Sequence, residues 1–387
     1  MIVGEVERAG EVAVRSAECL RGWRSDFIEF VQTLALAESP STVPESQSAV
    51  REILQGALLH LGFEVDCISG DRYGDHLLAQ MPGSAVQQML LGHLDTVWPV
   101  GTLNTMPVQL DGDILRGPGI FDMKGGLAIG IFALRALEKL ECVPPLVPGF
   151  LITAEEEIGS PESEPLIIDL AKGATRVFVL EPALGERGRV KTFRKGVGHF
   201  HVEVTGVSSH AGLSPDAGAS AVVELANVIQ SLTGLADPER GITVNVGVIS
   251  GGTRANVVAA RATGEVDVRV KTVEDAREIE VKINRIVASV PRTRVSIKGM
   301  VARDPLERTP RNQALWERAR GIATSIGVDL EEGESGGASD GNLTSQYTAT
   351  LDGLGAVGDG AHADHEFLHV DKTLDRVAIL AGLLTLP

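Results

Sequence analysis

Three short apolar runs, separated by segments with helical periodicity, limit the folds open to this chain. The runs are Met89–Leu91, Phe150–Ile152 and Val177–Leu180, and the segments between them include Leu127–Leu140 and Leu166–Lys172. Runs of this length suit strands that are covered on both faces. Buried strands that alternate with helices predict an α/β domain with a mixed, mostly parallel sheet.

Polar side chains follow each apolar run directly. His93 and Asp95 follow the first run, Glu155–Glu157 the second, and Glu181 the third. Because ligands bind beyond the carboxyl ends of parallel strands, we expect these side chains to converge. His93 and Asp95 should also point to one side of an extended segment, an arrangement that suits a metal ligand and its supporting partner.

Two later segments add candidates of the same kind. Asp122 lies in a glycine-rich turn, Gly117–Gly126, and the segment His362–His369 contains three histidines. Taken singly, each position also suits an ordinary role: Asp122 a turn residue, the three glutamates a solvated helix face. The residues alone do not separate His362 from His365 as a ligand.

The candidates together form a donor set of imidazole nitrogens and carboxylate oxygens without cysteine. Such a set suits Zn²⁺, with Co²⁺ or Mn²⁺ as substitutes. One shared carboxylate could bridge two ions about 3.5–4 Å apart, and a free carboxylate could act as general base. The sequence therefore predicts a two-metal site at the carboxyl edge of the sheet.

Length, charge and cysteine content narrow the class of protein. The 387 residues are enough for two domains, and a net charge of −17 disfavours nucleic acids and anionic membranes as partners. The three cysteines are far apart and match neither a disulfide framework nor a cysteine zinc site. No apolar run reaches membrane-spanning length, and residues 1–30 lack the apolar core of a secretory signal, so we expect a soluble cytoplasmic protein.

The pattern changes at about Lys195. Strands with alternating exposure and apolar-faced helices follow in a β-α-β-β-α-β-like order, which is typical of a two-layer α+β domain. The segments are His199–Val204, Ala219–Leu235, Ile242–Val248, Ala262–Val270 and Val273–Ala288. Because α/β character resumes after Met300, residues 195–300 are predicted to be an insert between residues 1–194 and 301–387 of one α/β domain.

Six motifs, in order from residue 92 to residue 366, resemble the M20 metallopeptidase family and, within it, the glutamate carboxypeptidases. The motifs are Gly92–Val97, Gly117–Gly126, Thr153–Ser160, Leu180–Pro182, Ser209–Gly212 and Gly360–Glu366. The resemblance covers most of the chain. It implies a zinc-peptidase-like catalytic domain made of residues 1–194 and 301–387, with a dimerisation domain inserted at 195–300.

The resemblance also implies a ligand set for two Zn²⁺ ions per subunit. His93 and Glu181 would hold one ion, Glu157 and His362 the other, and Asp122 would bridge them. The spacing between His362 and Glu366 matches the family's usual spacing, which favours His362 over His365.

Further roles follow from the same resemblance. Glu156 would be the general base, and Asp95 would orient His93. A cis peptide bond is expected at Asp122–Met123. His210 would reach into the active site of a second subunit and stabilise the tetrahedral oxyanion.

Substrate contacts are expected from five residues. Asn256 resembles a family asparagine that binds the carboxylate or carbonyl of the substrate. Either Arg269 or Arg303 could clamp a terminal carboxylate with its bidentate guanidinium, although each also suits a surface salt bridge. Gly336 and Gly337 would line the pocket with backbone amides.

These assignments predict a dinuclear zinc hydrolase that cleaves an amide bond next to a free carboxylate. The expected substrate is a small peptide or N-acyl amino acid that loses a C-terminal, glutamate-type residue. An N-acyl-amino-acid deacetylase or a dipeptidase of the same family is the alternative. A catalytically inactive binding protein would lack a ligand or the base, whereas this chain has all of them. We expect a homodimer.

Overall fold

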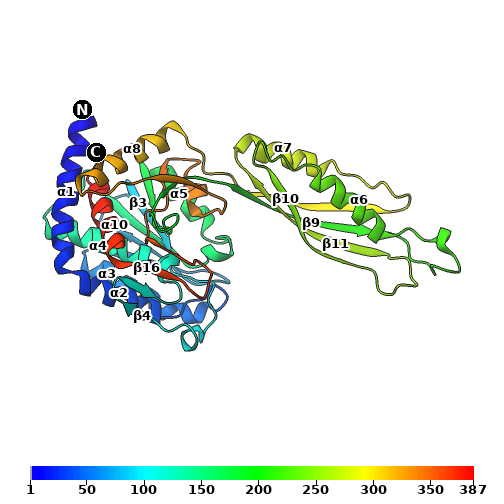
Figure 1. Ribbon diagram of the computed structural model, residues 1–387, viewed down its shortest axis with the longest axis horizontal. Helices are drawn as coiled ribbons and strands as arrows, with labels where there is room; N and C mark the ends of the chain where they lie inside the picture. The colour runs from blue at the N-terminus through cyan, green and yellow to red at the C-terminus, as the bar shows by residue number, and fades with distance from the viewer. Residues whose placement is uncertain (1) are drawn as a thin grey trace. The chain divides into compact units, whose positions relative to one another are not determined.

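The computed structural model describes residues 2–387, which divide into two compact units. The first unit comprises residues 2–193, Arg308–Ser335 and Ser339–Pro387. The second comprises Arg194–Glu307 and Gly336–Ala338. Figure 1 shows the elements of both units, with the two chain ends in the first.

A six-stranded sheet forms the centre of the described part of the first unit. Its order is β1 (Glu64–Ile68), β2 (His76–Gln80), β6 (Pro148–Thr153), β3 (Gln88–His93), β7 (Arg176–Val179) and β14 (Ala349–Leu351). The strands from β6 to β14 run parallel, whereas β1 and β2 are antiparallel to their neighbours. The prediction of a mixed, mostly parallel sheet is therefore confirmed.

The strands of this sheet are covered on both faces because successive side chains alternate between them. On β3, Leu90 joins the larger apolar core, whereas Met89 and Leu91 join the smaller one on the other side. The smaller core includes residues of α5 (Glu164–Gly173) and Leu343 of α9 (Asp340–Thr344). The larger core is formed with α1 (Ile2–Gly22), α2 (Arg24–Leu36), α3 (Ser48–His60), α4 (Gly125–Lys139), α8 (Pro310–Ser325) and α10 (Val370–Leu384).

Helix α4 packs closely against the carboxyl end of β7. A Cβ atom at Gly126 would lie 2.0 Å from the carbonyl oxygen of Leu180, so a larger residue there would push the helix away. The turn that contains Asp122 precedes α4, and Glu181 follows β7. The glycine therefore lets two candidate ligands approach each other.

The described part of the first unit also contains two smaller sheets. One pairs β15 (Gly358–Asp359), β16 (Phe367–His369), β5 (Ile114–Arg116) and β4 (Gln109–Asp111), and the other pairs β13 (Glu332–Ser335) with β8 (Val190–Arg194). β4 and β5 form a tight hairpin at Gly112, which has a positive φ of 61°. Among the described residues, no helix has both the length and the apolar character needed to cross a bilayer.

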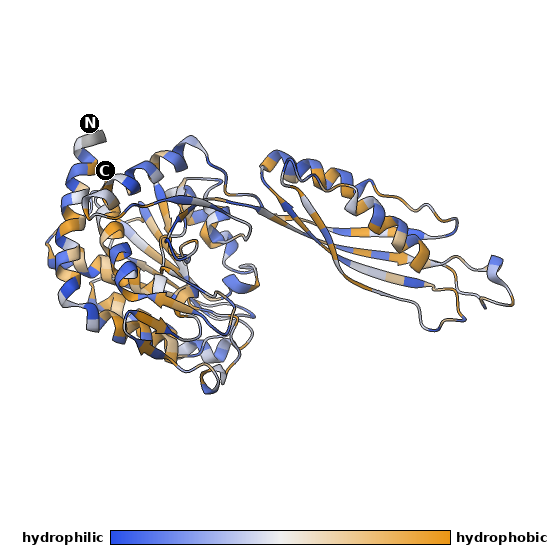
Figure 2. Ribbon diagram, in the orientation of Figure 1, coloured by the Kyte–Doolittle hydropathy of each residue, from blue (hydrophilic) through white to orange (hydrophobic). Residues whose placement is uncertain are grey.

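The second unit is a two-layer α+β structure, as predicted. An antiparallel sheet has the order β10 (Thr243–Gly251), β11 (Arg261–Val270), β9 (Gly196–Thr205) and β12 (Arg294–Arg303). Helices α6 (Ala221–Thr233) and α7 (Val273–Asn284) share its apolar core. On β9, Val202 is buried and His201 is exposed, so one face of the sheet packs on the helices and the other stays polar. Figure 2 shows hydrophobic and hydrophilic residues mixed along these strands.

Candidate metal centre

His93 ends β3 and is almost completely buried, at 1% exposure. Its Nδ1 atom lies 3.0 Å from the backbone oxygen of Asp95. Because a carbonyl can only accept, Nδ1 carries the proton and Nε2 is left as the atom that can bind a metal. Asp95 is itself held by Ser41, whose hydroxyl donates to Oδ2 at 2.6 Å.

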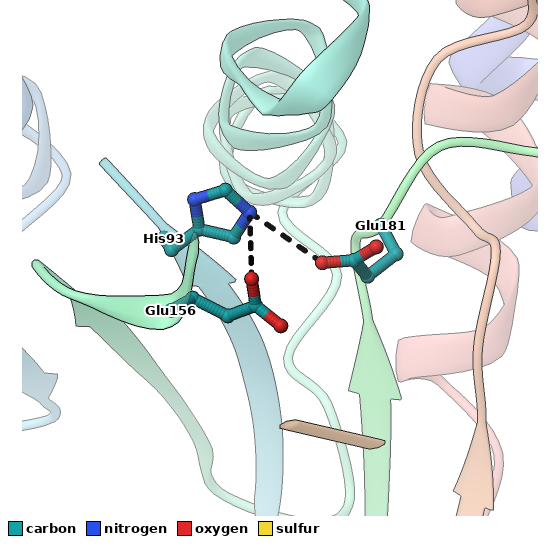
Figure 3. Close-up of side chains that lie close together, drawn as sticks. All are labelled: His93, Glu156 and Glu181. Atoms are coloured by element: carbon teal, nitrogen blue, oxygen red, sulfur yellow. Dashed lines mark ion pairs between the residues drawn. The ribbon is translucent and has the colours of Figure 1, made fainter. Parts of the chain in front are cut away.

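Carboxylates converge on the Nε2 atom of His93. Glu181 Oε1 lies at 3.5 Å, Asp122 Oδ1 at 3.6 Å and Glu156 Oε2 at 3.8 Å. Figure 3 shows Glu156 and Glu181 directed toward the imidazole from segments that follow two different strands. The polar side chains after successive strands thus meet in space, as the sequence predicted.

A second group of donors adjoins the first. His362 Nε2 lies 3.0 Å from Glu157 Oε2 and 3.5 Å from Asp122 Oδ2. Asp122 therefore turns one carboxylate oxygen toward His93 and the other toward His362, which is the placement expected of a bridging ligand. The side chain of His362 is half exposed, at 52%, and its backbone has a positive φ of 62°. The predicted cis peptide bond at Asp122–Met123 is present.

Several buried polar atoms in this centre lack a hydrogen-bond partner among the described residues. They are His93 Nε2, Asp122 Oδ1 and Glu157 Oε1. Leaving a buried polar group unsatisfied costs about 1–3 kcal/mol, so such atoms are rare in folded proteins. Ligand atoms in the groups His93/Glu156/Glu181 and His93/Asp122/Glu157 lie within 4.8 Å of one another. The donors fit a pair of divalent cations.

The electrostatics of the centre are also consistent with bound cations. Hydrogen bonds with Asp122 and Glu157 raise the pKa of His362 to about 10. Burial opposes ionisation of Asp122, but His362 and His93 hold the pKa of its carboxyl below the usual value. A bound cation would take the place of imidazole protons beside these carboxylates.

The three adjacent glutamates have different surroundings. Glu155 is fully buried and turns away from the centre, where it accepts the backbone amide of Ser163 at 2.7 Å. Glu156 and Glu157 face the two donor groups, and their amides donate to Asp95 at 3.2 Å each. Asp95 thus supports the glutamate turn as well as His93. Burial, followed by the charge of Glu181, raises the pKa of Glu156 well above its usual value.

Sequence reasoning missed two residues near this centre. Lys191 is buried in β8, and its charge helps to lower the pKa of Asp122. In the sequence, Glu366 was used only for its spacing from His362. Its buried carboxylate accepts the backbone amide of Asp122 at 3.0 Å. No signal in the sequence indicates either contact, because β8 is a short strand without alternating burial and the acidic character of the His362 segment does not point to Asp122.

Other predicted residues lie in the second unit. His210 is exposed, and its Nδ1 accepts hydrogen bonds from the amides of Gly212 and Leu213 at 3.1 Å each. Since Nδ1 is an acceptor, Nε2 carries the proton of the neutral ring and can donate it. Asn256 is exposed beside this loop, where its backbone oxygen accepts the amide of Ala211 at 3.0 Å.

The remaining substrate candidates also belong to the second unit. Arg269 makes two hydrogen bonds of 2.9 Å to Asp267, so its guanidinium already has a carboxylate partner within its own unit. Arg303 is buried at the end of β12. Gly336 and Gly337 are exposed, and the carbonyl oxygen of Gly337 accepts a hydrogen bond from Arg194 at 3.2 Å.

Comparison with known proteins gives consistent results. The sequence pattern of peptidase family M20/M25/M40 matches residues 89–386. Carboxypeptidase G2 of Pseudomonas sp. strain RS-16 is 26% identical over 367 residues, which cover 92% of this chain and 88% of the relative. A probable carboxypeptidase of Ajellomyces capsulatus is 30% identical over 284 residues, covering 66% of this chain and 63% of the relative.

Solved structures share the fold. Aminopeptidase PepT from Bacillus cereus superposes with a TM-score of 0.74 at 20% identity, covering 93% of this chain and 96% of the other. The M20 family metallo-carboxypeptidase Sso-CP2 from Sulfolobus solfataricus has a TM-score of 0.69 at 18% identity, with coverages of 94% and 98%. The YXEP protein of Bacillus subtilis, described as a dinuclear metal-binding peptidase, has a TM-score of 0.65 at 14% identity, with coverages of 94% and 98%.

Proposed function

The chain belongs to peptidase family M20/M25/M40, and we propose that it is a dinuclear zinc hydrolase that cleaves an amide bond next to a free carboxylate. The observation that carries this proposal is the position of Asp122, whose two carboxylate oxygens face two imidazoles from separate segments. The similarity to carboxypeptidase G2, which extends over nearly the whole chain, supports a carboxypeptidase activity.

For the two metals we propose the ligands that the family resemblance implies. His93 and Glu181 would hold one ion, Glu157 and His362 the other, with Asp122 between them. When bound, such a metal pair polarises the scissile carbonyl and lowers the pKa of a water molecule to about 7. His362 is preferred to His365, since His362 contacts both Asp122 and Glu157, whereas the ion-pair partner of His365 is Asp364.

Glu156 would act as the general base. Its carboxylate lies beside His93 and belongs to neither of the two proposed ligand sets. The hydrogen bond from its backbone amide to Asp95 fixes its place in the turn. Because burial raises its pKa, Glu156 can take a proton from the attacking water and keep it until the leaving amine accepts it.

The second unit would pair two subunits. Its strand β10 is at the edge of the sheet, where Val248 and Ile249 are each 61% exposed. Val222 and Val223 on the neighbouring α6 are also exposed. An open apolar edge strand is a template for pairing with another chain. In such a dimer His210 would reach the partner's metal centre and donate from Nε2 to the oxyanion.

The substrate would be a small peptide or an N-acyl amino acid with a C-terminal, glutamate-type residue. Asn256, the backbone amides of Gly336 and Gly337, and either Arg269 or Arg303 are proposed to bind it. An N-acyl-amino-acid deacetylase or a dipeptidase specificity is the alternative. Substrate specificity depends on the shape of the pocket, which distinguishes two substrates by only about 1–3 kcal/mol per methylene. Human carnosine dipeptidase 1 shares the fold of this chain, with a TM-score of 0.64.

Metal analysis combined with a substrate panel tests the proposal. The purified protein should bind about two Zn²⁺ ions per chain and hydrolyse N-acyl-glutamates. A chain that binds no more than a trace of metal would contradict the dinuclear mechanism. Faster turnover of N-acetyl amino acids or of dipeptides than of N-acyl-glutamates would favour the alternative specificities.

A further inference from the structure

The carboxylate of Glu366 is fully buried and is surrounded by hydrogen-bond donors. Oε1 accepts the backbone amides of Phe121 at 2.8 Å and Asp122 at 3.0 Å. Oε2 accepts the backbone amide of Gly119 and the indole nitrogen of Trp98, both at 2.8 Å. Three of these four donors belong to the turn that carries the proposed bridging ligand.

Glu366 also belongs to the loop that carries His362. This loop is closed by hydrogen bonds from the amide of Ala363 to Gly360 and from the amide of Glu366 to Ala363. The backbone oxygen of Glu366 accepts the amide of Gly117 at 3.4 Å. One residue therefore joins, through its side chain and its backbone, the segment of His362 to the segment of Asp122.

A carboxylate suits this position because all four of its partners are donors. Replacing one oxygen by an amide nitrogen would leave two N–H groups facing a third donor and without an acceptor. The resulting penalty falls either on Phe121 and Asp122 or on Gly119 and Trp98, depending on which way the amide turns.

We propose that Glu366 is a positioning residue of the metal centre: it fixes the backbone of Asp122 relative to His362. This inference rests on the proposed dinuclear function, since it concerns the distance between a bridging carboxylate and a ligand of the second ion. Asp122 Oδ2 and His362 Nε2 lie 3.5 Å apart, and the hydrogen bond between Glu366 and Asp122 is made with the backbone amide of Asp122. Glu366 acts on this distance through the backbone.

The test compares Glu366→Gln with the control Trp98→Phe. Both variants disturb the same hydrogen-bond cluster, but Trp98→Phe removes one donor and leaves the Asp122 amide its acceptor. Zn²⁺ affinity is measured by competition with a chromogenic chelator, and hydrogen exchange is followed in peptides that contain residues 117–124. Residues that orient metal ligands typically contribute 10–100-fold to metal affinity, so Glu366→Gln should lose about that much for at least one ion.

The control should lose far less Zn²⁺ affinity than this, because it spares the orientation of the ligands. In Glu366→Gln, the amides of residues 117–124 should exchange faster than in the wild type even without metal, since their acceptor is lost. Equal Zn²⁺ affinity in Glu366→Gln and the wild type would overturn the inference, whatever the change in melting temperature. An equal loss of affinity in Trp98→Phe would also overturn it.

Failure of the proposed function would look different. A wild type that takes up no Zn²⁺ would contradict the dinuclear proposal and this inference with it, whereas a wild type with two ions and an unchanged variant would contradict the inference alone. If Glu366→Gln does not fold, Glu366→Asp replaces it. The shorter carboxylate keeps the charge but moves the acceptor, so affinity should fall by about tenfold, and an unchanged affinity would again overturn the inference.

Discussion

The candidate metal centre of the first unit and the His210 loop of the second are built in different ways. His93 and Asp95 are at most 1% exposed. The backbone oxygen of Asp95 binds the His93 ring, and the Asp95 carboxylate is held by Ser41 and by the amide of Glu156, which lie 54 and 61 positions away in the sequence. His210 is exposed, and its ring is held by amides two and three residues further along its own loop. The first region is preorganised by the fold, and the second by its local turn.

This difference corresponds to different tasks. Metal ligands must hold fixed distances, and buried hydrogen bonds from distant segments provide that rigidity. A residue that contacts a substrate, or a second subunit, must stay accessible. Substitutions in the first region should therefore affect metal and chemistry, and substitutions in the second should affect turnover or assembly without loss of metal.

The largest effect is expected from Glu156→Ala. This substitution removes the proton shuttle but none of the five proposed ligands, so kcat should fall by about 10²–10⁴-fold while both metals stay bound. Rates on an N-acyl-glutamate and metal content per chain check this. Glu157→Ala is the matched control, because the neighbouring residue should lose metal. If Glu156→Ala lost its metals and Glu157→Ala kept them, the two roles would be exchanged.

His210→Ala tests the other side of the comparison. Loss of an oxyanion donor should lower kcat by about 10²–10³-fold, with melting temperature and metal content near those of the wild type. Mixing His210→Ala with Glu156→Ala subunits should restore part of the activity if His210 acts across a dimer, since one site of the heterodimer then has both groups. If heterodimers of proven composition recovered no activity, His210 would have to act in the site of its own subunit.

Much of the first unit could be predicted because its signals are local. A run such as Phe150–Ile152 is too apolar for an exposed segment and too short for a helix. The alternation of such runs with helices indicated the parallel part of the sheet. The convergence of His93, Glu156 and Glu181 followed from a general property of parallel sheets, whereas the place of Asp122 beside them was implied only by the family resemblance. The antiparallel pairing of β1 and β2 in the same sheet has no such local signal.

Contacts between segments far apart in the sequence could not be predicted in this way. The hydrogen bonds from Glu156 and Glu157 to Asp95 depend on how two loops meet after folding. The carboxylate of Glu366 satisfies amides that are 244 or more positions away in the chain. Periodicity indicates which face of an element is buried, but it carries no information on such pairings.

Asp95→Asn sharpens the account of the first region. Asparagine keeps one acceptor oxygen, so either the amide of Glu156 loses its partner, or the amide of Glu157 and the hydroxyl of Ser41 lose theirs together. Zn²⁺ affinity should fall by about 10–100-fold, as for other residues that support metal ligands. Chelator competition measures this. An Asp95→Asn protein with unchanged affinity and kcat would show that the backbone alone holds the glutamate turn.

The smallest effect on folding is expected at the edge strand. Ile249→Lys places a charge on an apolar side chain that is 61% exposed, so stability of the single chain should change by no more than about 0.5 kcal/mol. Dimerisation should weaken, because a lysine on an edge strand opposes pairing with another strand. Sedimentation equilibrium checks the mass, and Val143→Lys, at an 88% exposed site of the first unit, is the control. If Ile249→Lys dissociated the protein while kcat stayed unchanged, His210 could not act across the interface, and both regions of the comparison would have to function within one chain.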